Sequence, residues 1–87
     1  MNTMTEQISE VSSVIKNLIE IQEDITVPRN VRLKIESINS TLRKETGLSI
    51  KINKALNELD ELSSDVNLQA YTRTQIWNVM SALEKLC

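Results

Sequence analysis

Seven carboxylates stand in two groups along the chain and are the side chains best suited to hold a metal ion. They are Glu20, Glu23, Asp24, Glu58, Asp60, Glu61 and Asp65. Carboxylate metal sites in helical bundles combine such residues with Glu-x-x-His motifs, and this sequence has no histidine. A solvated acidic face is the better interpretation, so we expect neither a metal site nor a cofactor.

The side chains that enzymes most often use as nucleophile and base are scarce. The chain has no histidine, one glycine and one cysteine, Cys87, so the usual nucleophile and base pairs and glycine-rich phosphate loops cannot be assembled. We therefore expect no catalytic residue and no enzymatic activity. A single cysteine also leaves no pair for an internal disulfide, which favours an intracellular, reducing compartment.

Targeting and membrane signals are also missing from the sequence. Residues 1–6 lack the basic region and apolar core of a signal peptide, and apolar residues occur at most two in a row. We therefore expect a cytoplasmic protein with no membrane-spanning segment.

Charge is unevenly distributed, although the net charge is only −2. Residues 1–28 carry a net charge of −4, residues 29–54 carry +5 and residues 55–87 carry −3. The basic middle segment could bind a phosphate backbone through Arg29, Lys34, Arg43, Lys44, Lys51 and Lys54. Against this, the segment has no aromatic residue to stack on bases, and the pI is about 5.1. Attraction between oppositely charged helices is the simpler explanation, and nucleic acid is the less favoured partner.

The chain contains two similar halves that are offset by forty-one residues. The segment from Asp24 to Arg32 matches the segment from Asp65 to Arg73, and apolar type is kept at matched positions on both sides. These positions follow helical spacing, so each half predicts a helix, a short turn and a second helix. Two amphipathic helices can align by register alone, but the matched polar residues of the turns favour an internal repeat, at about 8–46 and 49–87.

Helical spacing predicts four helices, at about 4–24, 28–45, 49–64 and 68–86. With one glycine, one proline and no alternating pattern of strand-forming residues, nothing in the sequence resembles a strand. A chain of 87 residues has room for one compact core. We therefore predict an all-α fold, a four-helix bundle made of two helical hairpins, in a single domain at 1–87.

The same spacing predicts which residues are buried. They are Ile8, Val11, Ile15, Leu18, Ile21 and Ile25, widened by Val14 and Ile19; Val31, Ile35, Ile38 and Leu42; Leu48, Ile52, Ala55, Leu56, Leu59 and Leu62; and Leu68 or Tyr71, Ile76, Val79, Leu83 and Leu86. The expected N-caps are Thr3 (with Glu6 as its capping-box partner), Thr26, Ser49 and Asn67. Gly47 is expected to close the second helix in the left-handed conformation.

Each predicted turn has an aspartate and an arginine at matching positions. These are Asp24 and Arg32 in the first turn, and Asp65 and Arg73 in the second. We expect each carboxylate to accept hydrogen bonds from freed amides of the turn or from the arginine of its own half. The predicted role of these four residues is structural.

The first turn resembles the HEAT class of helical repeats. The aspartate, the two valines and the arginine of that class are matched by Asp24, Val27, Val31 and Arg32. The second turn matches through Asp65, Leu68 and Arg73, with Thr72 in place of a valine. By this resemblance the two hairpins are expected to be HEAT-like.

The whole chain is also similar to a family of short uncharacterised archaeal proteins. The similarity is carried mainly by residues 24–32 and 71–79, and it departs from the family pattern at Gln69, where proline is usual. The resemblance implies a four-helix bundle and no known activity.

Arg73, Trp77 and Met80 form a candidate protein interface on a flank of the last predicted helix. Tryptophan and arginine are residue types that anchor protein interfaces. Trp77 lies beside the main apolar stripe and matches Glu36, which should face solvent. The alternative is that Trp77 fills the edge of the bundle under Arg73. If the flank is exposed, a homodimer that buries it is the simplest closed assembly.

Two functional interpretations follow from these residues. A small non-enzymatic protein-interaction or scaffold module is favoured, because helical hairpins present side faces to partners and nothing in the sequence performs chemistry. The alternative is an RNA-associated accessory protein that uses the basic middle segment. The sequence does not identify the partner in either case.

Overall fold

Four α-helices follow one another in the computed structural model, which describes residues 4–86 and their side chains from Glu10 onward. The helices are α1 (Met4–Gln22), α2 (Arg29–Arg43), α3 (Leu48–Ser63) and α4 (Ala70–Glu84). Within residues 4–86 there is no strand. The predicted all-α four-helix fold is therefore confirmed, and every helix begins and ends within two residues of its predicted position.

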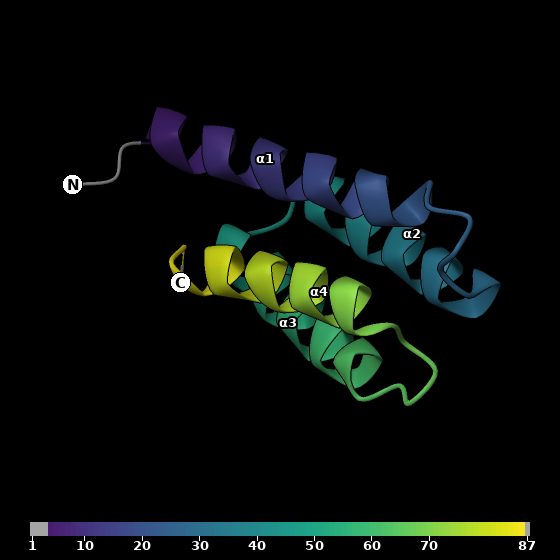
Figure 1. Cartoon of the computed structure of the whole chain (residues 1–87). Helices are drawn as coiled ribbons and strands as arrows, with labels where there is room; N and C mark the ends of the chain where they lie inside the picture. Colours follow the sequence, from purple (N-terminus) through teal and green to yellow (C-terminus); the bar gives the residue numbers. More distant parts are fainter. Residues whose placement is uncertain (1–3, 87) are drawn as a thin grey trace.

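The helices run antiparallel and form a closed ring (Figure 1). Both α1 and α3 pack against α2 and α4. The α1–α2 and α3–α4 turns lie together at one end of the molecule, which we call the turn end. The α2–α3 connection, the start of α1 and the end of α4 lie at the other end. The ring leaves a lengthwise seam on the outside between each pair of neighbouring helices.

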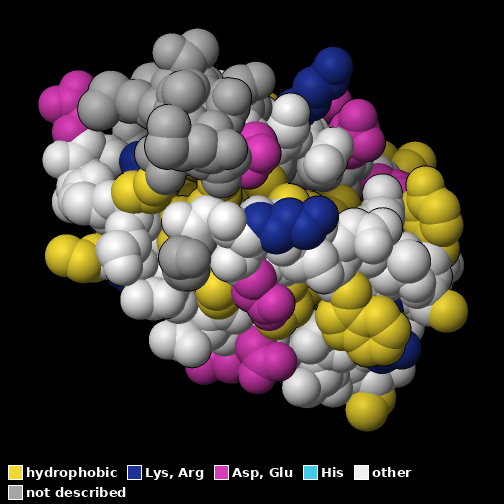
Figure 2. Space-filling view, turned by 90° about the vertical axis from the view of Figure 1, so that its left-hand side faces the viewer, with side chains coloured by type: hydrophobic (Ala, Val, Ile, Leu, Met, Phe, Trp, Pro, Cys, Tyr) yellow, Lys and Arg dark blue, Asp and Glu magenta, His cyan; other side chains and the backbone are white. Residues whose placement is uncertain are grey.

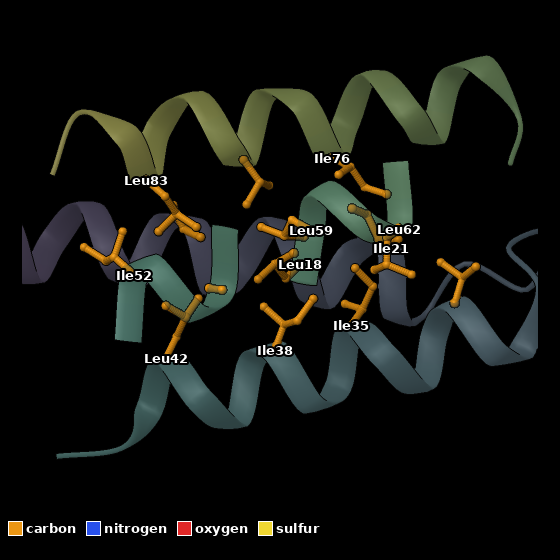
Figure 3. Close-up of a cluster of buried hydrophobic side chains, with 14 of the residues drawn as sticks. Leu18, Ile21, Ile35, Ile38, Leu42, Ile52, Leu59, Leu62, Ile76 and Leu83 are labelled. Carbon is orange, nitrogen blue, oxygen red and sulfur yellow. The ribbon is translucent and has the colours of Figure 1, made fainter. Parts of the chain in front are cut away.

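One cluster of apolar side chains fills the space that the four helices enclose (Figure 3). Leu18 on α1, Ile35 on α2, Leu59 on α3 and Ile76 on α4 are each 0% exposed. Burying a side chain of this size contributes about 1.5–3 kcal/mol relative to leaving it in water. Isolated helices of this length are marginal in water, so the shared core stabilises all four.

The two halves correspond in three dimensions at the offset seen in the sequence. Gln22 and Ser63, Arg29 and Ala70, and Arg43 and Glu84 are matching helix ends. The matched pairs in which both residues are buried and apolar are Val11 and Ile52, Val14 and Ala55, Leu18 and Leu59, Ile21 and Leu62, Val27 and Leu68, Ile35 and Ile76, Ile38 and Val79, and Leu42 and Leu83. The core is thus built from the same positions in each half.

Ile25 and Tyr71, two residues that the spacing allowed in the core, are exposed. Ile25 is 85% exposed, because α1 ends at Gln22 and the helical period no longer applies in the turn that follows. Val66, its match in the second turn, is 90% exposed. Of the two alternatives at the start of the last helix, Leu68 is buried and Tyr71 is exposed. The side chain of Ile8 lies outside the described part of the chain.

The predicted caps at the connection between α2 and α3 are wrong. α2 ends where Lys44 becomes extended, with φ −69° and ψ 151°, and its N–H donates to the carbonyl of Thr41 at 3.3 Å. Gly47 has φ −54° and ψ 136° and directly precedes α3, so it does not close α2 in the left-handed conformation. Ser49 lies inside α3, which has no side-chain cap. Thr3 lies outside the described residues.

Gly47→Ala is expected to raise the free energy of unfolding by about 0.4–1 kcal/mol. The backbone angles of Gly47 are open to any residue, and an added Cβ would meet Ile50 Cδ1 at 3.7 Å, an ordinary contact. The substitution therefore acts mainly by reducing the freedom of the unfolded chain. Urea denaturation measures the change, and a loss of stability would show that this position needs a conformation that glycine alone adopts.

Candidate functional site

Asp24 organises the α1–α2 turn with its own side chain. Its Oδ1 accepts the N–H of Thr26 at 2.9 Å and the hydroxyl of Thr26 at 2.6 Å. Its backbone carbonyl accepts the N–H of Val27 at 3.1 Å. A short carboxylate reaches the amide two residues ahead without strain, which is why aspartate is favoured in turns. The turn therefore satisfies much of its hydrogen bonding locally.

The α3–α4 turn has the same arrangement. Asp65 Oδ1 accepts the N–H of Asn67 at 2.8 Å, and the Asp65 carbonyl accepts the N–H of Leu68 at 3.2 Å. Of the two kinds of partner expected for Asp24 and Asp65, turn amides are the ones that these carboxylates bind.

The predicted N-caps of the second and fourth helices are wrong. Pro28 and Gln69 occupy the N-cap positions of α2 and α4, and neither helix has a side-chain cap hydrogen bond. Thr26 and Asn67 lie two residues earlier, where their amides bind the aspartates. The hydroxyl of Thr26 donates to Asp24 and so belongs to the turn.

The arginines of the two turns donate to backbone carbonyls. Arg32 Nε donates to the carbonyl of Val27 at 3.0 Å. Arg73 Nε donates to the carbonyl of Ser63 at 3.0 Å, and its Nη2 donates to the carbonyl of Asp65 at 2.8 Å. Ser63 ends α3, so its carbonyl lacks an intrahelical donor. Arg73 supplies that donor and ties α4 to the end of α3.

The carboxyl group of Asp24 is adapted to its ionised form. The hydrogen bond from the Thr26 hydroxyl lowers the pKa of Asp24 below its ordinary value, and the bond from the Thr26 N–H lowers it further. Partial desolvation raises the pKa, and the nearby charge of Arg32 lowers it by the least of these effects. Hydrogen bonding, more than ion pairing, therefore keeps this carboxylate charged.

Trp77 is the exposed member of the candidate interface on α4. Its side chain is 53% exposed. Met80 is partly buried and packs against the core, whereas the guanidinium of Arg73 binds the carbonyls of the turn. The structure therefore centres this candidate surface on Trp77, with the partly buried Met80 three residues further along α4 and Arg73 at the turn end of α4.

The basic residues of the middle segment are spread along the molecule, although Lys44 and Lys51 meet at the α2–α3 connection, where Lys51 Nζ donates to the carbonyl of Lys44 at 3.2 Å. Arg29 begins α2 at the turn end, whereas Lys44 follows the last residue of α2, about 20 Å away at 1.5 Å per residue. Lys34 Nζ lies 4.0 Å from a carboxylate oxygen of Glu58. Figure 2 shows basic and acidic side chains interspersed on the end that carries the α2–α3 connection. No single basic surface gathers the six residues named for nucleic acid.

Two polar grooves lie on outer seams of the ring. The α1–α4 seam has a groove of about 180 Å³, lined by Asn17, Glu20, Ile21, Gln75, Asn78 and Val79. The α1–α2 seam has a groove of about 290 Å³, lined by Ile19 and Gln22 of α1, by Glu23 directly after α1, and by Glu36, Asn39, Ser40 and Arg43 of α2. In residues 4–86, no group of three or more histidine, cysteine or acidic side chains is placed to hold a metal ion.

Asn39 is a buried polar residue that the apolar pattern did not identify. It is 3% exposed, its Nδ2 donates to Gln22 Oε1 at 3.4 Å, and its Oδ1 has no hydrogen-bond partner in the described part of the chain. One signal was present in the sequence, because the match of Asn39 in the second half is the apolar residue Met80. A polar residue at a repeated apolar position marks a place where the halves differ.

Asp24→Ala is expected to lower the free energy of unfolding at neutral pH, because Thr26 loses the acceptor for both its N–H and its hydroxyl. The folded-state pKa of Asp24 is lowered, so its contribution is complete above the unfolded-state pKa and is lost as pH falls through the folded-state pKa. Urea denaturation of wild type and variant should therefore show a difference at neutral pH that disappears in strong acid.

Two further variants act as controls for Asp24→Ala. Thr26→Val removes the hydroxyl but keeps the N–H, so it should cause a smaller loss that has the same dependence on pH. Glu61→Ala removes an exposed carboxylate of α3 and should change stability little. A deficit in Asp24→Ala that is equally large at neutral and acid pH would contradict the assigned role of the ionised carboxylate.

None of the described helices is long and apolar enough to cross a membrane.

The chain is similar to proteins from several archaea. It is 43% identical over 70 residues to a UPF0147 protein of Methanocaldococcus jannaschii, covering 79% of this chain and 75% of that protein. It is 33% identical over 87 residues to a UPF0147 protein of Pyrococcus abyssi, covering 99% of each. A crystal structure of a protein of this uncharacterised family from Thermoplasma acidophilum has a TM-score of 0.89 at 32% identity, covering 93% of this chain and 96% of that one.

The expected resemblance to short uncharacterised archaeal proteins is confirmed by these relatives. A second crystal structure, of a protein of unknown function, has a TM-score of 0.83 at 35% identity and covers 94% of this chain and 91% of that one. The family model that matches residues 1–86 is described as an uncharacterised protein family, UPF0147. Since that match spans nearly the whole sequence, the chain belongs to the UPF0147 family.

Proposed function

We propose that this chain is a small, non-enzymatic protein-interaction module of the cytoplasm, and that it contacts its partner through the flank of α4 around Trp77. The observation that supports this is the 53% exposure of Trp77. Tryptophan brings a large apolar area and one N–H donor to a contact, and it is enriched among the residues that dominate binding energy. A half-exposed indole therefore has much to gain from a partner surface.

A comparison of matched positions supports the placement on α4. Position 36 matches position 77, and there α2 presents the exposed charged side chain of Glu36. The two helices bury the same core positions, such as Ile35 and Ile76. The first hairpin thus completes its share of the core without an aromatic residue at this place. We infer that the indole serves a contact outside the chain.

A second copy of the chain is the simplest partner for this flank. Under two-fold symmetry a single self-complementary patch is enough to form a closed dimer. Aromatic side chains that meet across such an axis also gain from edge-to-face or offset stacking. The same flank would serve a different protein if that partner offers an apolar pocket for Trp77.

Trp77→Glu, which introduces the residue found at position 36, is expected to convert a homodimer into a folded monomer. The substitution changes an exposed position, so circular dichroism should show unchanged helix content. Removing an interface tryptophan typically costs about 2 kcal/mol or more of association free energy. Sedimentation over a concentration series measures the shift from dimer to monomer.

Leu33→Glu is the matched control, because Leu33 is 54% exposed on α2. It should leave the assembly unchanged. A wild-type chain that sediments as a monomer at high concentration would rule out the homodimer. Affinity capture from native extract with wild type and Trp77→Glu then tests the interaction itself, and an identical set of captured proteins would place the contact elsewhere.

An RNA-associated role is the competing outcome. It requires a salt-dependent mobility shift of labelled RNA that is lost in the double variant Arg43→Glu, Lys44→Glu. Such a shift, unaffected by Trp77→Glu, would replace the interaction proposal. On the end shown in Figure 2, the mixture of basic and acidic side chains disfavours a phosphate backbone.

A further inference from the structure

The α1–α2 seam and the α3–α4 seam occupy matching positions but have different chemistry. Where the second half has Trp77 and Met80, the first half has Glu36 and Asn39. On α2 these two residues lie on the same side as Ser40 and Arg43, because steps of three and four residues return to one helix face. Together with the facing stripe of α1, they line the groove of about 290 Å³.

Asn39 is the most deeply buried polar residue of this groove. It is 3% exposed, and its Oδ1 has no donor among the described residues. A buried carbonyl oxygen without a donor is unfavourable for folding. Met80 shows that an apolar side chain is accommodated at the matched position of the second half. The amide at position 39 thus lowers the stability of the fold relative to an apolar side chain. Its oxygen lacks a hydrogen-bond donor.

The charges around Asn39 indicate which donor would fit. Glu23, which directly follows α1, and Glu36 of α2 line the same groove, so a donor with a positive charge suits these carboxylates as well as the Asn39 oxygen. Since so little of Asn39 is exposed, a slim terminal group fits better than a planar guanidinium. Arg43 lies four residues beyond Asn39 in the groove, about 6 Å along the helix, so it disfavours a ligand that carries a second positive charge toward that end.

We propose that the α1–α2 groove binds a single primary ammonium group on a flexible chain, the chemistry of a lysine side chain. The ammonium donates to the carboxylates of Glu23 and Glu36 and, when the side chains that cover Asn39 Oδ1 move aside, to that buried oxygen. This site lies on α1 and α2 and is independent of the proposed contact through Trp77 on α4. The test of this site and the test of the interaction function proposed above are therefore independent.

A titration of the full chain with Nα-acetyl-lysine amide, followed by NMR of the backbone amides, tests the proposal. We expect saturable shifts that centre on Asn39 and the residues that line the groove. Nα,Nε-diacetyl-lysine amide is the matched control, because it has nearly the same shape without the charge, and it should cause no such shifts. Spermidine should bind less tightly than the lysine probe, and Arg43→Gln should reduce that difference.

Three variants assign the binding to the proposed residues. Glu36→Gln changes an exposed side chain and should weaken binding of the lysine probe about tenfold, as expected for one lost charge-assisted contact. Asn39→Met should abolish binding and raise the melting temperature, because it removes the buried oxygen. Trp77→Glu should leave the affinity unchanged. If Asn39→Met does not fold, Glu36→Gln decides.

Several results would overturn this site. They are the absence of saturable shifts with the lysine probe, equal shifts with the diacetylated control, and unchanged affinity in Glu36→Gln. A comparison of free lysine with lysine inside a blocked tripeptide then identifies the source of the ammonium group. Tighter binding of free lysine supports a free amine as the ligand, and tighter binding of the tripeptide supports a lysine side chain of a partner protein.

Discussion

The bond between each turn aspartate and the amide two residues ahead is the interaction on which both hairpins depend. Asp24 and Asp65 each fix a short reversal of the chain. Val27, which is 2% exposed, enters the core directly after the first reversal. Leu68, which is 6% exposed, does so after the second. The geometry of the turn thus sets the register in which the next helix meets the core, and that register decides which of its residues are buried.

The two halves of the chain match in the core of the bundle but differ along its outer seams. Matching apolar residues such as Leu18 and Leu59 fill the same places from each half, so the requirement for stability is met twice in the same way. The outer seams are not constrained by that core. There the halves differ, with the polar groove around Asn39 on one side and the exposed Trp77 on the other. Both of our proposals come from positions where the halves no longer match.

Much of the fold could be predicted from the sequence, because helical periodicity is a local property of the chain. All four apolar residues predicted for the second helix are buried in α2. The wrong predictions concern residues of the turn, where helical periodicity no longer applies and other hydrogen-bond partners are nearer. The hydroxyl of Thr26 was expected to cap α2 but binds the nearer carboxylate of Asp24. Ile25 continued an apolar pattern beyond the end of its helix.

The candidate sites were less predictable from the sequence, for a related reason. Trp77 could be singled out because its match is Glu36, which is a comparison within the sequence. The α1–α2 groove depends on how two helices face each other, and Gln22 meets Asn39 across that seam. Periodicity gives the face of each helix but not the alignment of one helix against another. The groove is therefore a property of the folded chain and is not specified by the pattern of any one helix.

The closed ring of helices has a consequence for the order in which they can be connected. α4 packs against α1, and the start of α1 and the end of α4 lie at the same end of the molecule as the α2–α3 connection (Figure 1). A chain cut within that connection and joined from α4 to α1 would run α3, α4, α1, α2 and keep every pair of neighbouring helices. Both aspartate turns would remain intact. A circular permutant that exchanges the places of the two hairpins in the chain is therefore expected to form the same four-helix ring.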